Sequence, residues 1–214
     1  PPIYQIRIVT MMNLSRISKN ILSSGFALLV GLSASTASAG PPTDFVKGKT
    51  KDVTSILAKK ESKARAKKLD KILQQSVDFR ELAARSLKGH WEKQTPEAQQ
   101  EFLDLLQRML EANYSSKLSG KQLGADYSIE YLDEKTRGDL AIVKTKVMVK
   151  EDTKPIAYKL TKKDSGWIVF DIVIDDISLE ETYRESYTAI IEAEGWDSLI
   201  SRMKEKIKEL ESAK

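Results

Sequence analysis

Cysteine is absent from this 214-residue sequence, and histidine occurs only once, at His90. Without cysteine the chain forms no disulfide and no thiolate metal site, and any histidine-based triad or metal site would depend on one residue. The sequence also has no glycine-rich phosphate loop, no G-x-S-x-G motif and no cluster with metal-ligand spacing. His90, beside Trp91 near a helix end, is expected to have a structural or capping role. We therefore predict no catalytic residue, metal or cofactor.

Two adjacent carboxylates, Asp175 and Asp176, are the remaining candidates for chemistry. Successive strand residues point to opposite faces of a sheet, so this pair would share one site only if the chain turned there. We expect the pair to end a strand and lead into a helix, with a metal or acid/base pair as the alternative.

Apolar runs long enough to cross a membrane, about 18 to 20 residues, are also absent. The run from Ile21 to Leu32 is shorter and lies in a pattern typical of a secretory signal. Arg16 and Lys19 precede it, and an A-x-A cleavage site follows, ending at Ala39.

This pattern divides the chain into two parts. We predict that residues 1–39 are upstream sequence plus a removed signal peptide, and that residues 40–214 form a single exported domain. A bacterial periplasm fits, as would any other extracytoplasmic space. An uncleaved membrane anchor is the alternative.

The net charge of the chain is small once residues 1–39 are removed. Lys and Arg fall from 35 to 32 against 31 Asp and Glu, which argues against a nucleic-acid partner. The lysine-rich stretch "KKESKARAKKLDK" is expected to form a solvated helix face, with attraction to an anionic surface as the alternative.

Helical periodicity is present in residues 44–119 and again in 178–212. Three local signals mark helix starts: Asp78, the Thr95-Pro96 pair, and a capping box at Ser178. Gly195 marks a helix end. The apolar set of the helix that starts at Pro96 is wider than one contact stripe requires.

Residues 127–174 change to a period of two. They predict four strands, at 127–132, 140–150, 155–162 and 167–174, joined by short connections into an antiparallel sheet. The last strand is apolar on both faces, which predicts a central strand covered by helices. Simple alternation places Ile168, Phe170, Ile172 and Ile174 on one face.

The stretches "DFRELAARSLKGHWEKQTPEAQQEFLDLLQRMLEANY", "AIVKTKVMVK", "GWIVFDIVIDDISLEETYRESYTAII" and "GWDSLISRMKEKI" together resemble the toluene-tolerance family of periplasmic phospholipid carriers, the MlaC proteins. The resemblance covers about Asp44 to Lys208. It departs from the family pattern at Lys88, where the glycine follows one place later, and in "SLEETYRESY".

This resemblance implies an α+β fold in which several helices pack on a four-stranded antiparallel sheet around an apolar cavity for lipid tails. It implies a monomer that carries phospholipid between an outer-membrane lipoprotein complex and an inner-membrane ABC transporter. This transport maintains outer-membrane lipid asymmetry. We predict that the lipid-binding residues are Leu87, Trp91, Leu106, Leu110, Tyr114, Val143, Val147, Tyr158, Ile172, Ile174, Tyr183 and Tyr187, with ordinary core packing as the alternative for each.

Two other functions stay open. A carrier for another apolar lipid, such as a hopanoid, would show the same tail pocket in its sequence. A small periplasmic enzyme is the third hypothesis, and the lack of acid/base partners argues against it.

Overall fold

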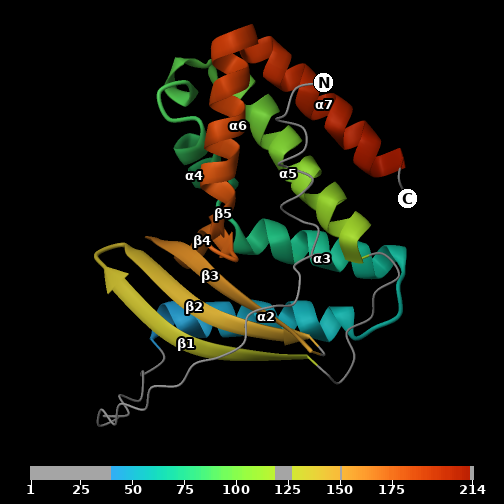
Figure 1. Ribbon diagram of the computed structural model, residues 1–214, viewed down its shortest axis with the longest axis vertical. Coiled ribbons are helices and arrows are strands. Elements are labelled where there is room, and N and C mark those ends of the chain that lie inside the picture. Colours follow the sequence, from blue (N-terminus) through green and yellow to red (C-terminus); the bar gives the residue numbers. More distant parts are fainter. Residues whose placement is uncertain (1–39, 119–126, 150, 213–214) are drawn as a thin grey trace, which may run out of the picture. The chain divides into compact units, whose positions relative to one another are not determined.

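The computed structural model describes residues 40–118, 127–149 and 151–212, without the side chains of residues 114–118. Helices come first, an antiparallel sheet follows, and two helices end the chain (Figure 1). The predicted α+β class and order of elements are therefore confirmed. All described residues belong to one compact unit, and the predicted division at residues 39 and 40 stays a prediction because residues 1–39 lie outside the described part.

The first described helix, α2 (Pro41–Leu57), has no side-chain cap from its own N-cap residue, Gly40. A carboxylate oxygen of Glu134, on strand β1 (Tyr127–Arg137), accepts hydrogen bonds from the backbone N–H groups of Gly40 and Thr43 at 3.1 and 2.9 Å. The N-terminal N–H groups of a helix have no partners within the helix and favour negative charge. A residue distant in sequence therefore fixes the start of α2 against the sheet.

Local caps begin the next two helices, α3 (Lys63–Ser76) and α4 (Phe79–Ser86). The hydroxyl of Ser62 accepts from the N–H of Arg65, and the carboxylate of Asp78 accepts from the N–H of Glu81. The backbone N–H of Asp78 also donates to the carbonyl of Val169 at 2.7 Å, which ties the α3–α4 junction to the sheet.

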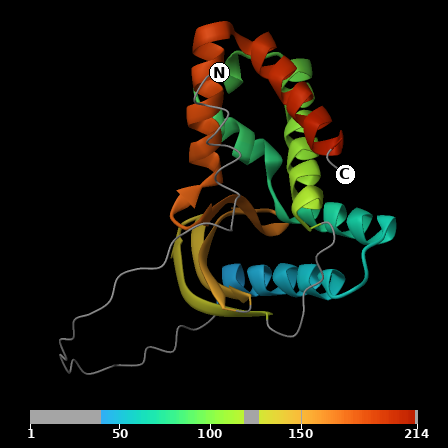
Figure 2. The same cartoon turned by 45° about the vertical axis from the view of Figure 1, so that its right-hand side comes forward.

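The remaining helices pack with α4 around a hydrophobic core of their own. The 3₁₀ turn η1 (Trp91–Lys93) precedes α5 (Pro96–Leu118), and α6 (Leu179–Glu194) and α7 (Trp196–Ser212) end the chain. Fully buried Phe102 contacts the rings of Trp91, Tyr187 and Trp196 at centroid distances of 5.6 to 6.0 Å. The two views agree that α4, α5, α6 and α7 pack together, apart from α2 (Figures 1 and 2).

The sheet contains five strands in the order β1-β2-β3-β4-β5, all antiparallel. The strands after β1 are β2 (Leu140–Val149), β3 (Asp152–Lys163), β4 (Gly166–Ile174) and the two-residue β5 (Ile177–Ser178). The sequence predicted four, because a two-residue strand shows no periodicity. Strand β1 also extends to Arg137, beyond its predicted end at residue 132.

Helices cover both faces of β4, as its two apolar faces predict. One face packs on α2, and the other meets α4 and α6. The prediction that Phe170 and Ile172 share a face is wrong, because a bulge places Lys159 opposite Asp171 and Leu160 opposite Val169. The extra residue in the bulge, Phe170, instead faces α4, where the guanidinium carbon of Arg85 lies 4.2 Å from the centroid of the Phe170 ring.

Asp175 and Asp176 form the two-residue turn between β4 and β5. Both have left-handed backbones, with φ of 50° and 63°, as a tight hairpin of this length requires. Asp175 pairs with Lys154 at 2.7 Å. The expected role at the end of a strand therefore fits the geometry.

Candidate functional site

An apolar cavity of about 270 Å³ lies between α2, α3 and the inner face of the sheet. Helix α2 and the sheet enclose it from two sides. Helix α3 and Val77, the residue that follows it, form a third wall. The lining residues are Phe45, Val46, Lys49, Thr50, Val53, Leu69, Ile72, Leu73, Ser76, Val77, Tyr127, Val147, Ile156, Tyr158, Val169 and Ile172.

Polar groups in this wall are largely satisfied by the protein itself. The hydroxyl of Thr50 lies 2.6 Å from that of Tyr131 and 2.8 Å from the carbonyl of Val46, and the hydroxyl of Ser76 donates to the carbonyl of Ile72. Because these groups already have partners, they present little hydrogen-bonding capacity to a ligand. No carboxylate is among the lining residues, so the wall offers shape and apolar contact rather than acid/base chemistry.

Three predicted binding residues line the cavity: Val147, Tyr158 and Ile172. Cross-strand pairing explains this, since Tyr158 lies opposite both Val143 on β2 and Ile172 on β4. Val143 is on the same face, but it is fully buried among side chains of α2 and the sheet. Ile174 continues this face to the end of β4, where it is 39% exposed.

The structure gathers most of the other predicted residues elsewhere. Leu87, Trp91, Leu106, Tyr183 and Tyr187 are buried in the core of α4–α7, and Leu110 packs against that core. The side chain of Tyr114 lies outside the described residues. The other eleven residues therefore divide between the cavity region and a helical core, and the role of all twelve in binding remains a prediction.

The helical periodicity of residues 44–119 predicts α2 and α3 as helices but does not show that they wall a cavity. Their apolar positions include Val53, Leu69 and Ile72. These apolar side chains line the cavity and pack in or against the small cluster formed by Ile56, Leu57 and Leu69. The signal in the sequence was that both helices are amphipathic, so each needs an apolar surface to pack on.

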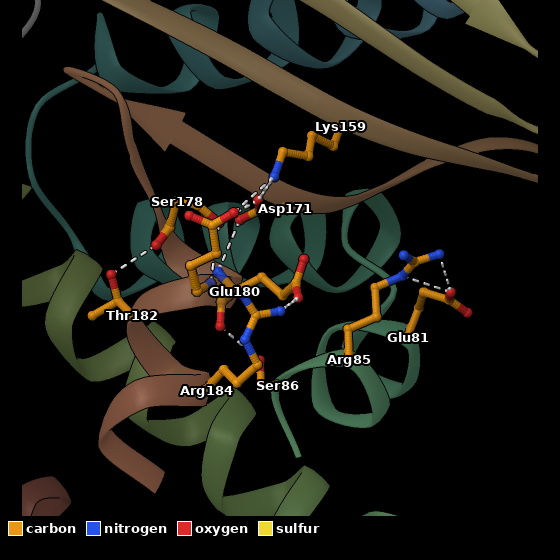
Figure 3. A network of polar contacts seen from close by, with 10 residues as sticks. Glu81, Arg85, Ser86, Lys159, Asp171, Ser178, Glu180, Thr182 and Arg184 are labelled. Atoms are coloured by element: carbon orange, nitrogen blue, oxygen red, sulfur yellow. Dashed lines mark hydrogen bonds and ion pairs between the residues drawn. The ribbon is translucent and has the colours of Figure 1, made fainter. Parts of the chain in front are cut away.

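Asp171, for which the sequence predicted no role, has a fully buried side chain on the β4 face that meets α6. Its carboxylate accepts from the Ser178 hydroxyl at 2.6 Å and from the Glu180 N–H at 2.9 Å, and pairs with the Lys159 ammonium at 2.8 Å (Figure 3). Ser178 in turn accepts from the N–H of Glu181, which confirms the predicted cap. This network fixes the start of α6 to the sheet beside the cavity wall.

Tyr183 and Tyr187 stack in the helical core, with ring centroids 5.0 Å apart. Burial raises the pKa of the Tyr183 phenol, and burial together with the neighbouring Tyr183 raises the pKa of Tyr187. Among the described residues, the Tyr187 hydroxyl is the one buried side-chain polar atom with no hydrogen-bond partner. Both groups stay neutral at physiological pH, which suits a packing role.

Within the described ranges, no helix is both long and apolar enough to cross a membrane. The same residues contain no group of three or more His, Cys, Asp or Glu side chains placed to hold a metal ion.

Comparison with solved structures finds a close fold match. The phospholipid-binding protein of Ralstonia solanacearum, solved in complex with a phospholipid, superposes with a TM-score of 0.72 at 21% sequence identity. The match covers 80% of this chain and 99% of the other, so the two proteins share the fold. No curated protein matches the sequence. The family described as MlaC protein matches residues 47–205, which is most of the chain, and the protein therefore belongs to the MlaC family.

Proposed function

We propose that this protein is a periplasmic lipid carrier that holds the acyl chains of a phospholipid in the cavity between α2, α3 and the sheet. The apolar cavity carries this proposal, because its wall presents aliphatic and aromatic side chains and few free polar groups. Membership of the MlaC family and the fold shared with a phospholipid-binding protein support it.

The energetics explain why a carrier is needed. Exposure of acyl chains to water costs about 0.8 kcal/mol per methylene, so two chains of about sixteen carbons cost on the order of 20 kcal/mol. An apolar cavity removes most of this barrier to crossing an aqueous compartment. The charged head group can remain in solvent, because burial would be unfavourable without partners.

The partners in this function are an outer-membrane lipoprotein complex and an inner-membrane ABC transporter, which the carrier contacts in turn as a monomer. Transport between them maintains the lipid asymmetry of the outer membrane and with it tolerance to solvents such as toluene. A carrier works by binding and release, so this function requires no catalytic residue.

A lipid extract tests the proposal. The protein is purified from the periplasm, extracted with organic solvent and the extract is analysed by mass spectrometry. We expect phospholipid at a defined ratio to protein. A polycyclic lipid such as a hopanoid would contradict a phospholipid ligand, and an extract without lipid would contradict the carrier function.

Cross-linking tests the location. A phospholipid with a photoreactive group in its tail should label peptides that contain residues 45–53, 69–77 and 147–158. Peptides from the helical core, such as residues 183–191, are the internal control. Predominant labelling of the control peptides would place the site in the core of α4–α7 instead.

A further inference from the structure

Positive charge is concentrated in the two helices that wall the cavity. Residues 41–76, which form α2, α3 and their linker, contain ten Lys and Arg against four Asp and Glu, whereas residues 77–214 contain 22 against 27. The small net charge of the domain therefore hides a strongly basic segment and an acidic remainder.

Six lysines of this segment form one surface, which we call the basic face. Lys63, Lys67 and Lys71 follow each other at four-residue intervals on α3, so they lie along one stripe of the helix with Lys68 beside it. Lys59 and Lys60 precede them in the linker. All six side chains are exposed, and none pairs with an acid in the part of the chain that the structure describes.

A buried arginine orders the linker. Arg65 is 6% exposed, and its guanidinium donates to the carbonyl of Lys59 at 3.0 Å. This bond holds the linker against the first turn of α3, so that Lys59 and Lys60 stay close to the lysine stripe. The one arginine of the segment therefore has a structural role, and the exposed positive charges are all lysines. The same stretch also contains the exposed Glu61 and the partly buried Asp70.

The opposite side of α3 faces the cavity. Leu69, Ile72 and Leu73 line it, while the lysines point away. A helix with its side chains is about 10 Å across. A surface bound to the basic face would therefore lie within about one helix diameter of the cavity.

We propose that the basic face docks the protein on the surface of an anionic phospholipid bilayer. Clusters of four to eight basic residues on a helix are attracted to anionic lipid. Lysine ammonium groups are compact and strongly hydrated, which suits a diffuse layer of head groups. A protein partner with defined carboxylates would favour arginine, and lysine is depleted in protein interfaces. This inference does not depend on the proposed cargo, because it concerns the outer side of α3.

Sedimentation with vesicles tests the inference. Protein purified after expression of the complete sequence is mixed with phosphatidylcholine vesicles that contain either no anionic lipid or about 30 mol % phosphatidylglycerol. Binding should occur only to the anionic vesicles and should fall steeply between about 0.05 M and about 0.5 M salt, because salt screens exposed charges.

A charge-matched pair of variants locates the surface. The test variant changes four lysines of the basic face to glutamine: Lys63→Gln, Lys67→Gln, Lys68→Gln and Lys71→Gln. The control removes the same charge from exposed lysines elsewhere: Lys88→Gln, Lys93→Gln, Lys144→Gln and Lys208→Gln. Each lysine near an anionic surface contributes roughly five-fold in affinity, so the test variant should bind at least ten-fold more weakly while the control changes less than two-fold.

Three results would overturn the inference: absence of binding to anionic vesicles, equal binding to neutral ones, or equal loss in both variants. Capture of an acidic protein through the basic face without vesicle binding would also reject it. Bound phospholipid is measured in the same preparations. If wild-type protein contains none but still docks on vesicles, the proposed carrier function fails and the docking surface stands.

Discussion

Two valines on the same face of β2, four residues apart, should respond in opposite ways to tryptophan. Val147 lines the cavity, whereas Val143 is fully buried in the packed cluster beside it. Ile142 lies on the outer face and is 38% exposed. The three positions therefore place one substitution in the cavity, one in a packed core and one near solvent.

The expected loss of lipid follows from the size of the indole ring. If the ring of Val147→Trp displaces about three methylenes from the cavity, binding loses about 2.4 kcal/mol, or roughly fifty-fold in affinity. The ring fills space that the acyl chain otherwise occupies, so the stability of the protein without lipid should change little. Co-purifying phospholipid should fall sharply.

At position 143 there is no cavity that the indole ring of Val143→Trp could fill. Overpacking of a tight core costs about 1 to 3 kcal/mol, which corresponds to a decrease of roughly 2 to 12 °C in the melting temperature of a domain of this size. Ile142→Trp should change neither property, and it controls for the larger side chain.

The assay measures phospholipid phosphorus per mole of purified protein and the melting temperature after lipid is removed. A Val147→Trp protein that keeps its full lipid content and melts as low as Val143→Trp would refute the assignment of this cavity as the tail site. Equal loss of lipid in Ile142→Trp would show that tryptophan on β2 acts through some other effect.

The remaining predictions concern the network beside the cavity, the helical core and the leader. Asp171→Ala should lower the free energy of unfolding by about 2 to 4 kcal/mol, since it removes the buried acceptor of two hydrogen bonds and the carboxylate partner of the partly buried Lys159; a loss below about 1 kcal/mol in urea titration would contradict this. Asp175→Asn should change stability by no more than about 1 kcal/mol, because asparagine tolerates the left-handed turn and the ion pair is half-exposed, and a loss of bound lipid would show a direct role. Ser178→Ala should cost about 1 kcal/mol through the lost cap, measured in the same titration. Tyr187→Phe should leave stability unchanged or raise it by up to about 1 kcal/mol, because the hydroxyl has no partner. Burial raises the folded pKa of this tyrosine above its unfolded value near 10, so wild-type protein should lose stability as pH rises above about 10, and the phenylalanine variant should lose less. N-terminal sequencing of the secreted protein should find a start at or near Gly40, and a retained leader in a membrane fraction would contradict the cleavage site.

The sequence by itself determined the type and order of the elements. Caps at Asp78 and Ser178, the Thr95-Pro96 start and the Gly195 end act within a few residues of chain, so their signals are local and readable. Periods of 3.6 and two residues separated helix from strand for the same reason, and the resemblance to the MlaC family rested on these local stretches.

Only the tertiary structure decided which apolar faces enclose a cavity and which form core. Val143 and Val147 belong to one stripe of one strand, and periodicity shows that this stripe avoids water without showing what fills the space before it. The same limit applies to Leu87 and Tyr183, whose apolar faces meet other helices instead of the cavity. The cap that Glu134 supplies to α2, across 91 to 94 residues, likewise has no local signal, because folding alone brings the two together.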